Sequence, residues 1–159
     1  MDNIVIFGAP GSGKGTYSAA LVEHFGYAHI STGDVLRGEI KADTELGRIA
    51  KGYMDQGQLI PDDLIIDMLA NVYDSKKGSK GVIFDGFPRT IAQAEALELL
   101  LERRHMKAIL LDMFVEEDEV IKRLLNRGKT SGRADDNYET IKKRLQVYQA
   151  ETKPVCTYY

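Results

Sequence analysis

Cysteine is almost absent from this chain, and that scarcity excludes two common ways of stabilising a small domain. The only cysteine among the 159 residues is Cys156. A single thiol forms neither an internal disulfide nor a multi-cysteine zinc site, so the sequence predicts no zinc. Long apolar runs are lacking as well, because stretches such as residues 4–7 and 108–111 have only the length of a strand. We therefore expect no membrane-spanning segment and no membrane partner.

Neither sign of charge is in large excess. Lysine and arginine number 21 against 24 aspartate and glutamate residues, which gives a net charge of −3. Domains that bind nucleic acid carry a basic surplus, so we expect no nucleic-acid partner. The first residues also lack the basic region and apolar core of a signal peptide. Together with the single cysteine, these features predict a cytoplasmic enzyme or binding domain.

Short aliphatic runs alternate with segments of helical spacing along the chain. Strands are expected at residues 3–7, 81–84 and 107–113, with a weaker one at 28–30, and helices at 90–104, 117–127 and 137–151. This alternation predicts an α/β fold in one domain, a doubly wound, mostly parallel sheet with helices on both faces. Two polar, glycine-containing stretches interrupt it, residues 31–60 with short helical fragments and residues 128–136 as a loop. We interpret both as insertions over the ligand-binding edge of the sheet.

A glycine-rich loop follows the first expected strand. Residues 8–16 read GAPGSGKGT and lead into a helical pattern. Glycines let backbone N–H groups curl around phosphate oxygens at a helix N-terminus, and Lys14 adds a positive charge, so the segment predicts a phosphate-binding P-loop. The usual P-loop has Ser or Thr directly after the lysine, whereas this chain has Gly15 and then Thr16. The alternative is an ordinary strand–helix turn.

The Gly-Lys-Gly-Thr sequence resembles the nucleoside monophosphate kinases. Three further stretches are similar to the adenylate kinase family within that group, namely STGDVLR at 31–37, DGFPR at 85–89, and GRADD at 132–136 followed by Arg144. The resemblance implies a P-loop kinase with an AMP-binding insertion at 31–60 and a short lid at 127–137. It also implies magnesium-dependent interconversion of ATP and AMP with two ADP, by a monomer.

The resemblance also implies roles for individual residues. The ATP-binding set is Gly11, Ser12, Gly13, Lys14, Gly15, Thr16 and Arg127. The AMP-binding set is Thr32, Arg37, Gln58, Leu59, Ile60, Gly86, Phe87, Pro88, Arg89, Gln93, Arg133 and Arg144. The catalytic set is Lys14, Arg89, Arg123, Arg133 and Arg144, and Asp85 would hold magnesium through water. Arg37 and Arg133 are expected to have little to pair with until phosphate arrives.

The residues themselves leave several alternatives open. Arg144 lies on the inward side of its expected helix, where a guanidinium either meets a structural carboxylate or reaches a ligand. Gln93 stands three residues after Thr90 and fits a capping box as well as a base contact. Asp112 ends a strand as Asp85 does. Asp135 and Asp136 fit either lid contacts or a solvated turn, and the histidines are interpreted as structural or solvated.

Other functions compete with an adenylate kinase. A UMP/CMP-type or guanine nucleoside monophosphate kinase would share most of the motifs, although Thr32 with Gln93 favours AMP. A P-loop switch protein would need Ser or Thr after Lys14 and a guanine-reading motif, and the sequence has neither. Adenylate kinases continue past the stretch that resembles residues 154–159 with a strand and a helix. We therefore expect a truncated chain, with 107–113 at a sheet edge, and a nucleotide-binding fragment without turnover is a further alternative.

Overall fold

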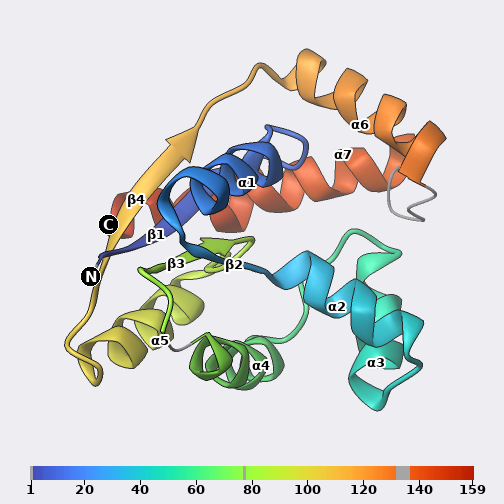
Figure 1. Ribbon diagram of the computed structural model, residues 1–159. Coiled ribbons are helices and arrows are strands. Elements are labelled where there is room, and N and C mark those ends of the chain that lie inside the picture. The colour runs from blue at the N-terminus through green and yellow to red at the C-terminus, as the bar shows by residue number, and fades with distance from the viewer. Residues whose placement is uncertain (1, 77, 132–136) are drawn as a thin grey trace.

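The computed structural model describes residues 2–76, 78–131 and 137–159 (Figure 1). Its sheet has four strands in the order β2-β3-β1-β4, and every neighbouring pair is parallel. The strands are β1 (Asp2–Gly8), β2 (Ala28–Ser31), β3 (Val82–Asp85) and β4 (Lys107–Met113). The predicted doubly wound parallel sheet is thereby confirmed, including the weak second strand.

Eight α-helices and one π-helical turn are assigned among the described residues. They are α1 (Lys14–Phe25), α2 (Thr32–Lys41), α3 (Glu45–Met54), α4 (Asp62–Ser75), α5 (Ile91–Glu102), α6 (Glu117–Ser131), α7 (Tyr138–Val147), the π-turn η1 (Tyr148–Thr152) and α8 (Val155–Tyr158). Helix α4 was not predicted from the sequence. Residues 128–131, expected in a loop, are the last turn of α6, and the expected helix 137–151 gives way to η1 after Val147.

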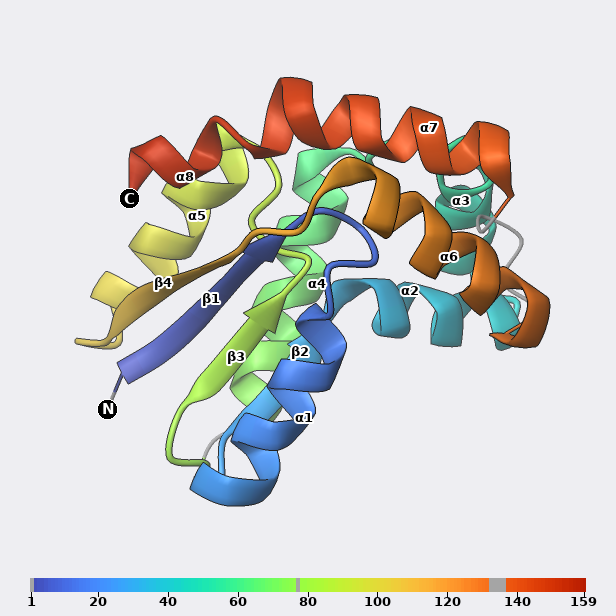
Figure 2. The ribbon, with the colours of Figure 1, turned by 90° about the horizontal axis from the view of Figure 1, so that it is seen from above.

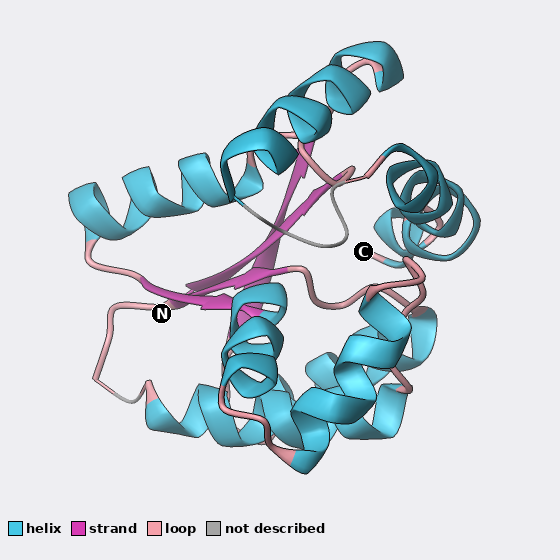
Figure 3. Cartoon of the chain, turned by 90° about the vertical axis from the view of Figure 1, so that its right-hand side faces the viewer, coloured by secondary structure: helices cyan, strands magenta, loops and turns pink. Residues whose placement is uncertain are grey.

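Helices cover both faces of the sheet, with α4 and α5 on one side and α1 on the other (Figures 1–3). The main core lies on the side of α4 and α5. Its sheet residues include Val5, Ile30 and Phe84, which are at most 1% exposed. Helix α4 adds residues spaced by four and α5 residues spaced by three and four, as amphipathic helices require; these are Ile65, Leu69, Tyr73, Ala94, Leu97 and Leu101.

A second, smaller core joins α6 to α7. It consists of Val120, Leu124, Ile141 and Leu145, none more than 5% exposed. Each pair is spaced by four residues, which places both members on one face of its helix. This contact fixes the helices that carry Arg123, Arg127 and Arg144.

Strand β4 lies at one edge of the sheet, as expected (Figure 2). Ala108 and Leu110 pack against the main core, whereas Ile109 and Leu111 are 56% and 40% exposed on the opposite face. Within the described ranges, no helix is both long and apolar enough to cross a membrane.

Candidate active site

The glycine-rich loop connects β1 to α1, as a P-loop requires. Gly13 caps α1 with a φ of 98°, a left-handed conformation that a side chain disfavours. Lys14 folds back over the loop, and its Nζ donates to the carbonyl oxygens of Gly8 at 2.8 Å and Ala9 at 3.1 Å. The predicted strand–loop–helix arrangement is present.

The electrostatics around Lys14 favour an anion. Burial lowers the pKa of the Lys14 ammonium to about 7. Asp85 opposes this shift, while the positive charges of Arg89, Arg144 and Arg127 add to it. So many cations around one half-buried ammonium repel one another, and a polyphosphate would relieve that repulsion.

Two adjoining cavities meet at these cations. The P-loop cavity is formed by the glycine-rich loop, the carboxyl ends of β2 and β3, and α6; its lining includes Gly11, Gly13, Lys14, Gly15, Thr16, His29, Asp85, Arg123 and Arg127. The second, which we call the acceptor cavity, is lined by apolar side chains such as Leu36, Ile60, Ile65 and Phe87. Both cavities share Lys14, Arg37, Arg89 and Arg144.

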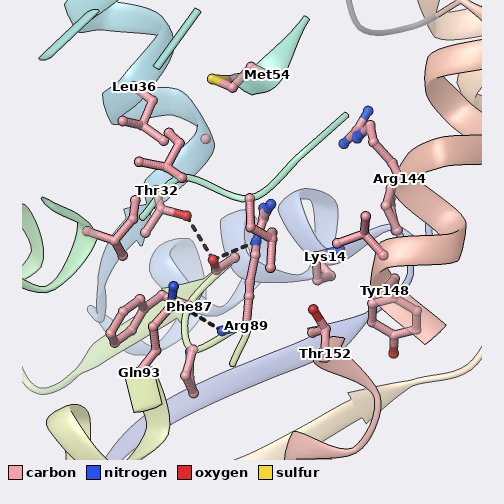
Figure 4. Close-up of a pocket in the computed structure, with 18 of the residues that line it drawn as sticks. Lys14, Thr32, Leu36, Met54, Phe87, Arg89, Gln93, Arg144, Tyr148 and Thr152 are labelled. Carbon is pink, nitrogen blue, oxygen red and sulfur yellow. Dashed lines mark hydrogen bonds between the residues drawn. The ribbon is translucent and has the colours of Figure 1, made fainter. Parts of the chain in front are cut away.

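The acceptor cavity has two walls of different origin (Figure 4). Thr32, Phe87 and Gln93 lie on one side, contributed by α2, the loop after β3, and α5. Tyr148 and Thr152 lie on the other side and come from the π-turn η1. Arg89 and Arg144 reach in between the two walls.

Gly86 connects two side chains of this cavity, Thr32 and Arg89. Its carbonyl oxygen accepts hydrogen bonds from Thr32 Oγ1 at 2.9 Å and from Arg89 Nε at 2.8 Å. Its φ is 82°, and a Cβ on Gly86 would lie 2.7 Å from Thr32 Oγ1 and 2.9 Å from an Arg89 amino nitrogen. Only glycine fits without moving both side chains.

Comparison with known proteins identifies the family. The adenylate kinase family model matches residues 6–159. The adenylate kinase of Parabacteroides distasonis is 64% identical over 160 residues, covering all of this chain and 84% of that protein. That of Bacteroides thetaiotaomicron is 68% identical with 85% of its length covered, and that of Porphyromonas gingivalis strain W83 is 55% identical with 82% covered. The chain belongs to the adenylate kinase family. It is accordingly a nucleoside monophosphate kinase, as the resemblance implied.

Most residues that the adenylate kinase resemblance implied for ATP line the P-loop cavity. Ser12 is the exception, since it is 2% exposed, does not line the cavity, and has no hydrogen-bond partner for its Oγ among the described residues. Arg123 and Arg127 are one helical turn apart on α6, and both line the cavity. Arg123 Nε also donates to Glu119 at 3.0 Å.

The residues implied for AMP line the acceptor cavity wherever the structure describes them. They are Thr32, Arg37, Gln58, Leu59, Ile60, Gly86, Phe87, Pro88, Arg89, Gln93 and Arg144. Arg133, Asp135 and Asp136 lie outside the described residues, as does the central part of the expected lid. One expectation was wrong, because Arg37 is not short of a partner: it forms an ion pair with Asp34, one helical turn earlier.

The structure shows where Arg144 and Gln93 lie relative to the cavities. Arg144 is half-buried on α7 and lines both cavities. Gln93 does take part in a helix cap, although its Oε1 accepts from the backbone N–H of Arg89, at 2.7 Å, and not from that of Thr90. Thr90 Oγ1 accepts from the Gln93 backbone N–H at 3.2 Å. Gln93 lines the acceptor cavity at the same time.

Asp85 and Asp112 are separated clearly by the structure. The Asp85 side chain is 11% exposed and lines the P-loop cavity, whereas Asp112 is exposed on β4 and lines neither cavity. His29 Nε2 lies 3.1 Å from Asp85 Oδ2, a contact that sequence reasoning missed. The signal for it is the parallel register, which aligns Ser31 with Asp85 and sets His29 on the adjacent strand.

Other lining residues also escaped sequence reasoning. The sequence analysis assigned no role to Leu36, Met54 or Thr152, and it placed Tyr148 in the regular helix expected at 137–151. The π-turn η1 places Tyr148 and Thr152 at the cavity, and no local sequence pattern marks this turn. Asp62, which binds Gln93, was missed because it lies about thirty residues away in an unpredicted helix.

Proposed function

We propose that this chain transfers the γ-phosphoryl group of ATP to AMP, with ATP phosphates in the P-loop cavity and AMP in the acceptor cavity. The observation that carries the proposal is the meeting of the two cavities at Lys14, Arg37, Arg89 and Arg144. Two nucleotides placed in them would bring their phosphates together at the cations, and their bases would lie at opposite ends. That is the arrangement which direct, in-line phosphoryl transfer needs.

The P-loop side would bind and orient the donor. Backbone N–H groups of residues 11–16 would hold the β-phosphate at the N-terminus of α1, and Lys14 would neutralise charge between the β- and γ-phosphates. Arg123 and Arg127 would hold the γ-phosphate from α6. Lys14 stands on α1, and Arg123 and Arg127 stand on α6, so their backbones are positioned before ATP arrives and little reorganisation would accompany the reaction.

The acceptor side would orient AMP for attack. Arg37 and Arg89 would bind the AMP phosphate, leaving one of its oxygens to attack the γ-phosphorus. The bond between the γ-phosphorus and the bridging oxygen then breaks, and ADP leaves as another ADP forms. Arg144, at the junction, would neutralise charge on the moving group, and Arg133 would join it from the lid. The insertion 31–60 and the lid 127–137 would close over both nucleotides and exclude water.

The residues present fit magnesium held mainly by the nucleotide. In the described part of the chain, no group of three metal-ligating side chains comes together. Asp85 supplies one nearly buried carboxylate at the P-loop cavity. Magnesium keeps several waters and often takes one carboxylate besides phosphate oxygens, so Asp85 would hold it through water. When bound, the ion would neutralise charge on the phosphates.

The identity of the acceptor base is the finer part of the proposal. Thr32 and Gln93 line the acceptor cavity, together with backbone near Gln58, Leu59 and Ile60. Thr32 is at most 3% exposed and Gln93 2%, so polar contacts made there are shielded from water. The presence of Thr32 together with Gln93 supports AMP over UMP or CMP as the acceptor. We further propose that the chain acts as a monomer in the cytoplasm.

A coupled assay of ADP formation from ATP with AMP, CMP, UMP or GMP tests the function. Lys14→Met removes the buried charge and should lower turnover roughly a hundredfold or more. Lys122→Met is the matched control, since Lys122 is exposed on α6, and it should leave turnover unchanged. Greater activity on CMP or UMP than on AMP would refute the acceptor assignment. Near-normal turnover in Lys14→Met would refute the P-loop assignment, and no turnover of any monophosphate would favour a binding fragment.

A further inference from the structure

Asp62 is a half-buried carboxylate that lines neither cavity and belongs to none of the motifs. It is the first residue of α4. Its Oδ1 accepts two hydrogen bonds, from Gln93 Nε2 at 2.8 Å and from Thr90 Oγ1 at 3.0 Å. The carboxylate therefore connects the start of α4 to the start of α5 directly behind the wall of the acceptor cavity.

The contacts of Gln93 fix which end of its amide is oxygen and which is nitrogen. Nε2 donates to Asp62, and an ionised carboxylate only accepts. Oε1 accepts from the backbone N–H of Arg89 at 2.7 Å, and a backbone N–H only donates. Because each partner has one role, the amide has one favourable orientation. Gln93 is 2% exposed, so both of these hydrogen bonds are shielded from bulk water.

Each end of the amide keeps one hydrogen-bonding position for the cavity. Nε2 has a second hydrogen and Oε1 a second lone pair. A 6-aminopurine offers an acceptor at N1 beside a donor at the 6-amino group, and a 6-oxopurine offers the reverse, a donor at N1 beside an acceptor oxygen. An unrestrained glutamine amide would pair with either base by turning over, so it would not distinguish them.

We propose that Asp62 is a positioning residue that holds the Gln93 amide in one orientation and so makes the acceptor site select 6-amino over 6-oxo purines. This rests on the proposed function, in which Gln93 contacts the acceptor base. Turning the amide over would set Oε1 against the Asp62 carboxylate and the NH2 group against the Arg89 N–H. Two unsatisfied, repelling contacts in a buried site oppose that change strongly.

The test compares AMP with inosine monophosphate, which differs from it only at N1 and the 6-position. In the unmodified chain, kcat/KM for AMP should exceed that for inosine monophosphate by at least about a hundredfold. Asp62→Asn keeps the shape but lets residue 62 donate as well as accept, so the ratio should fall about tenfold. Asp63→Asn is the matched control, because Asp63 is exposed in the same helical turn and loses the same charge. It should leave the ratio unchanged.

A structural role alone gives a different result. Equal losses on both monophosphates in Asp62→Asn, or no change in the ratio, would overturn the proposal. In a Gln93→Leu background, Asp62→Asn should have no further effect on the ratio, since the group through which it acts is gone. If Asp62→Asn fails to fold, a crystal structure of the unmodified chain with AMP decides: Gln93 Nε2 must stay on Asp62, and a Gln93 turned away from it overturns the proposal.

The unmodified chain separates this proposal from the proposed function. ADP formed equally well from AMP and inosine monophosphate would leave the kinase function intact and refute the role of Asp62. No ADP from AMP would refute the proposed function. In that case, calorimetry would measure the selectivity for AMP over inosine monophosphate as a ratio of affinities, in the unmodified chain and in Asp62→Asn. A ratio near one in the unmodified chain refutes the role of Asp62.

Discussion

At the scale of single residues, one backbone carbonyl organises the acceptor cavity. The carbonyl of Gly86 accepts from both Thr32 and Arg89, so the residues proposed to contact the base and the phosphate of AMP are tied to the same atom. The left-handed backbone of Gly86 makes that possible and leaves no room for a Cβ.

Gly86→Ala should therefore disturb both contacts. The left-handed conformation costs a side-chain-bearing residue about 1–2 kcal/mol, and the new methyl group must displace Thr32 or Arg89. We expect a lower melting temperature and at least a tenfold loss of kcat/KM for AMP. Gly38→Ala is the control, because a Cβ on Gly38 meets nothing within 4 Å in α2, and it should leave activity unchanged and stability equal or higher. Equal behaviour of the two variants would contradict the role of Gly86.

A second residue-scale prediction concerns the proton on Lys14. The pKa of Lys14 is lowered to about 7, mainly by burial, so at pH 8 most of the empty protein lacks this proton. Bound phosphates favour the charged form and raise the pKa, so ATP binding should take up a proton at pH 8 and much less at pH 6. Calorimetry in buffers of different ionisation enthalpy measures the uptake. Lys14→Arg keeps its charge at both values of pH and should abolish this part of it; the same uptake in that variant would contradict the assignment.

At the scale of elements, the outward face of the edge strand β4 is poorly covered. Alternation along β4 directs Leu110 into the main core and Ile109 outward, at the unpaired edge of the described sheet. Exposed edge strands with aliphatic side chains promote association between molecules.

Ile109→Lys should reduce aggregation of this chain on heating or concentration, with a change in stability of no more than about 0.5 kcal/mol. Leu110→Lys, one residue along, should instead lower the melting temperature markedly, because it places a charge against the core. Light scattering and thermal denaturation of the two variants measure both effects. A large destabilisation by Ile109→Lys would mean that this face of β4 is covered.

The strands and the P-loop could be predicted from the sequence because local patterns determine them. Buried parallel strands are short runs of Ile, Val and Leu, and Lys14 is placed by the glycines around it. Helix α4 has apolar residues at Ile65, Leu69 and Tyr73, yet it follows directly on the polar insertion 31–60 and was overlooked. The contacts of Asp62 with Gln93 and of His29 with Asp85 join residues far apart in sequence, so no local pattern contains them.

At the scale of the whole molecule, the strand order brings the site together. Residues from the ends of β1, β2 and β3 meet with α5, α6 and α7 around two cavities, because parallel strands present their carboxyl ends on one side. The main core fixes the acceptor wall, and the α6–α7 core fixes Arg123, Arg127 and Arg144. Binding of two nucleotides therefore depends on the relative position of these two cores.

The central claim is that one chain binds two nucleotides with their phosphates end to end across the shared cations. A bisubstrate analogue in which two adenosines are joined by five phosphates tests it directly by calorimetric titration. We predict one analogue per chain, with binding weakened by prior saturation with either ATP or AMP. Two analogues per chain, or competition with only one of the two nucleotides, would contradict the claim that the two cavities form one site.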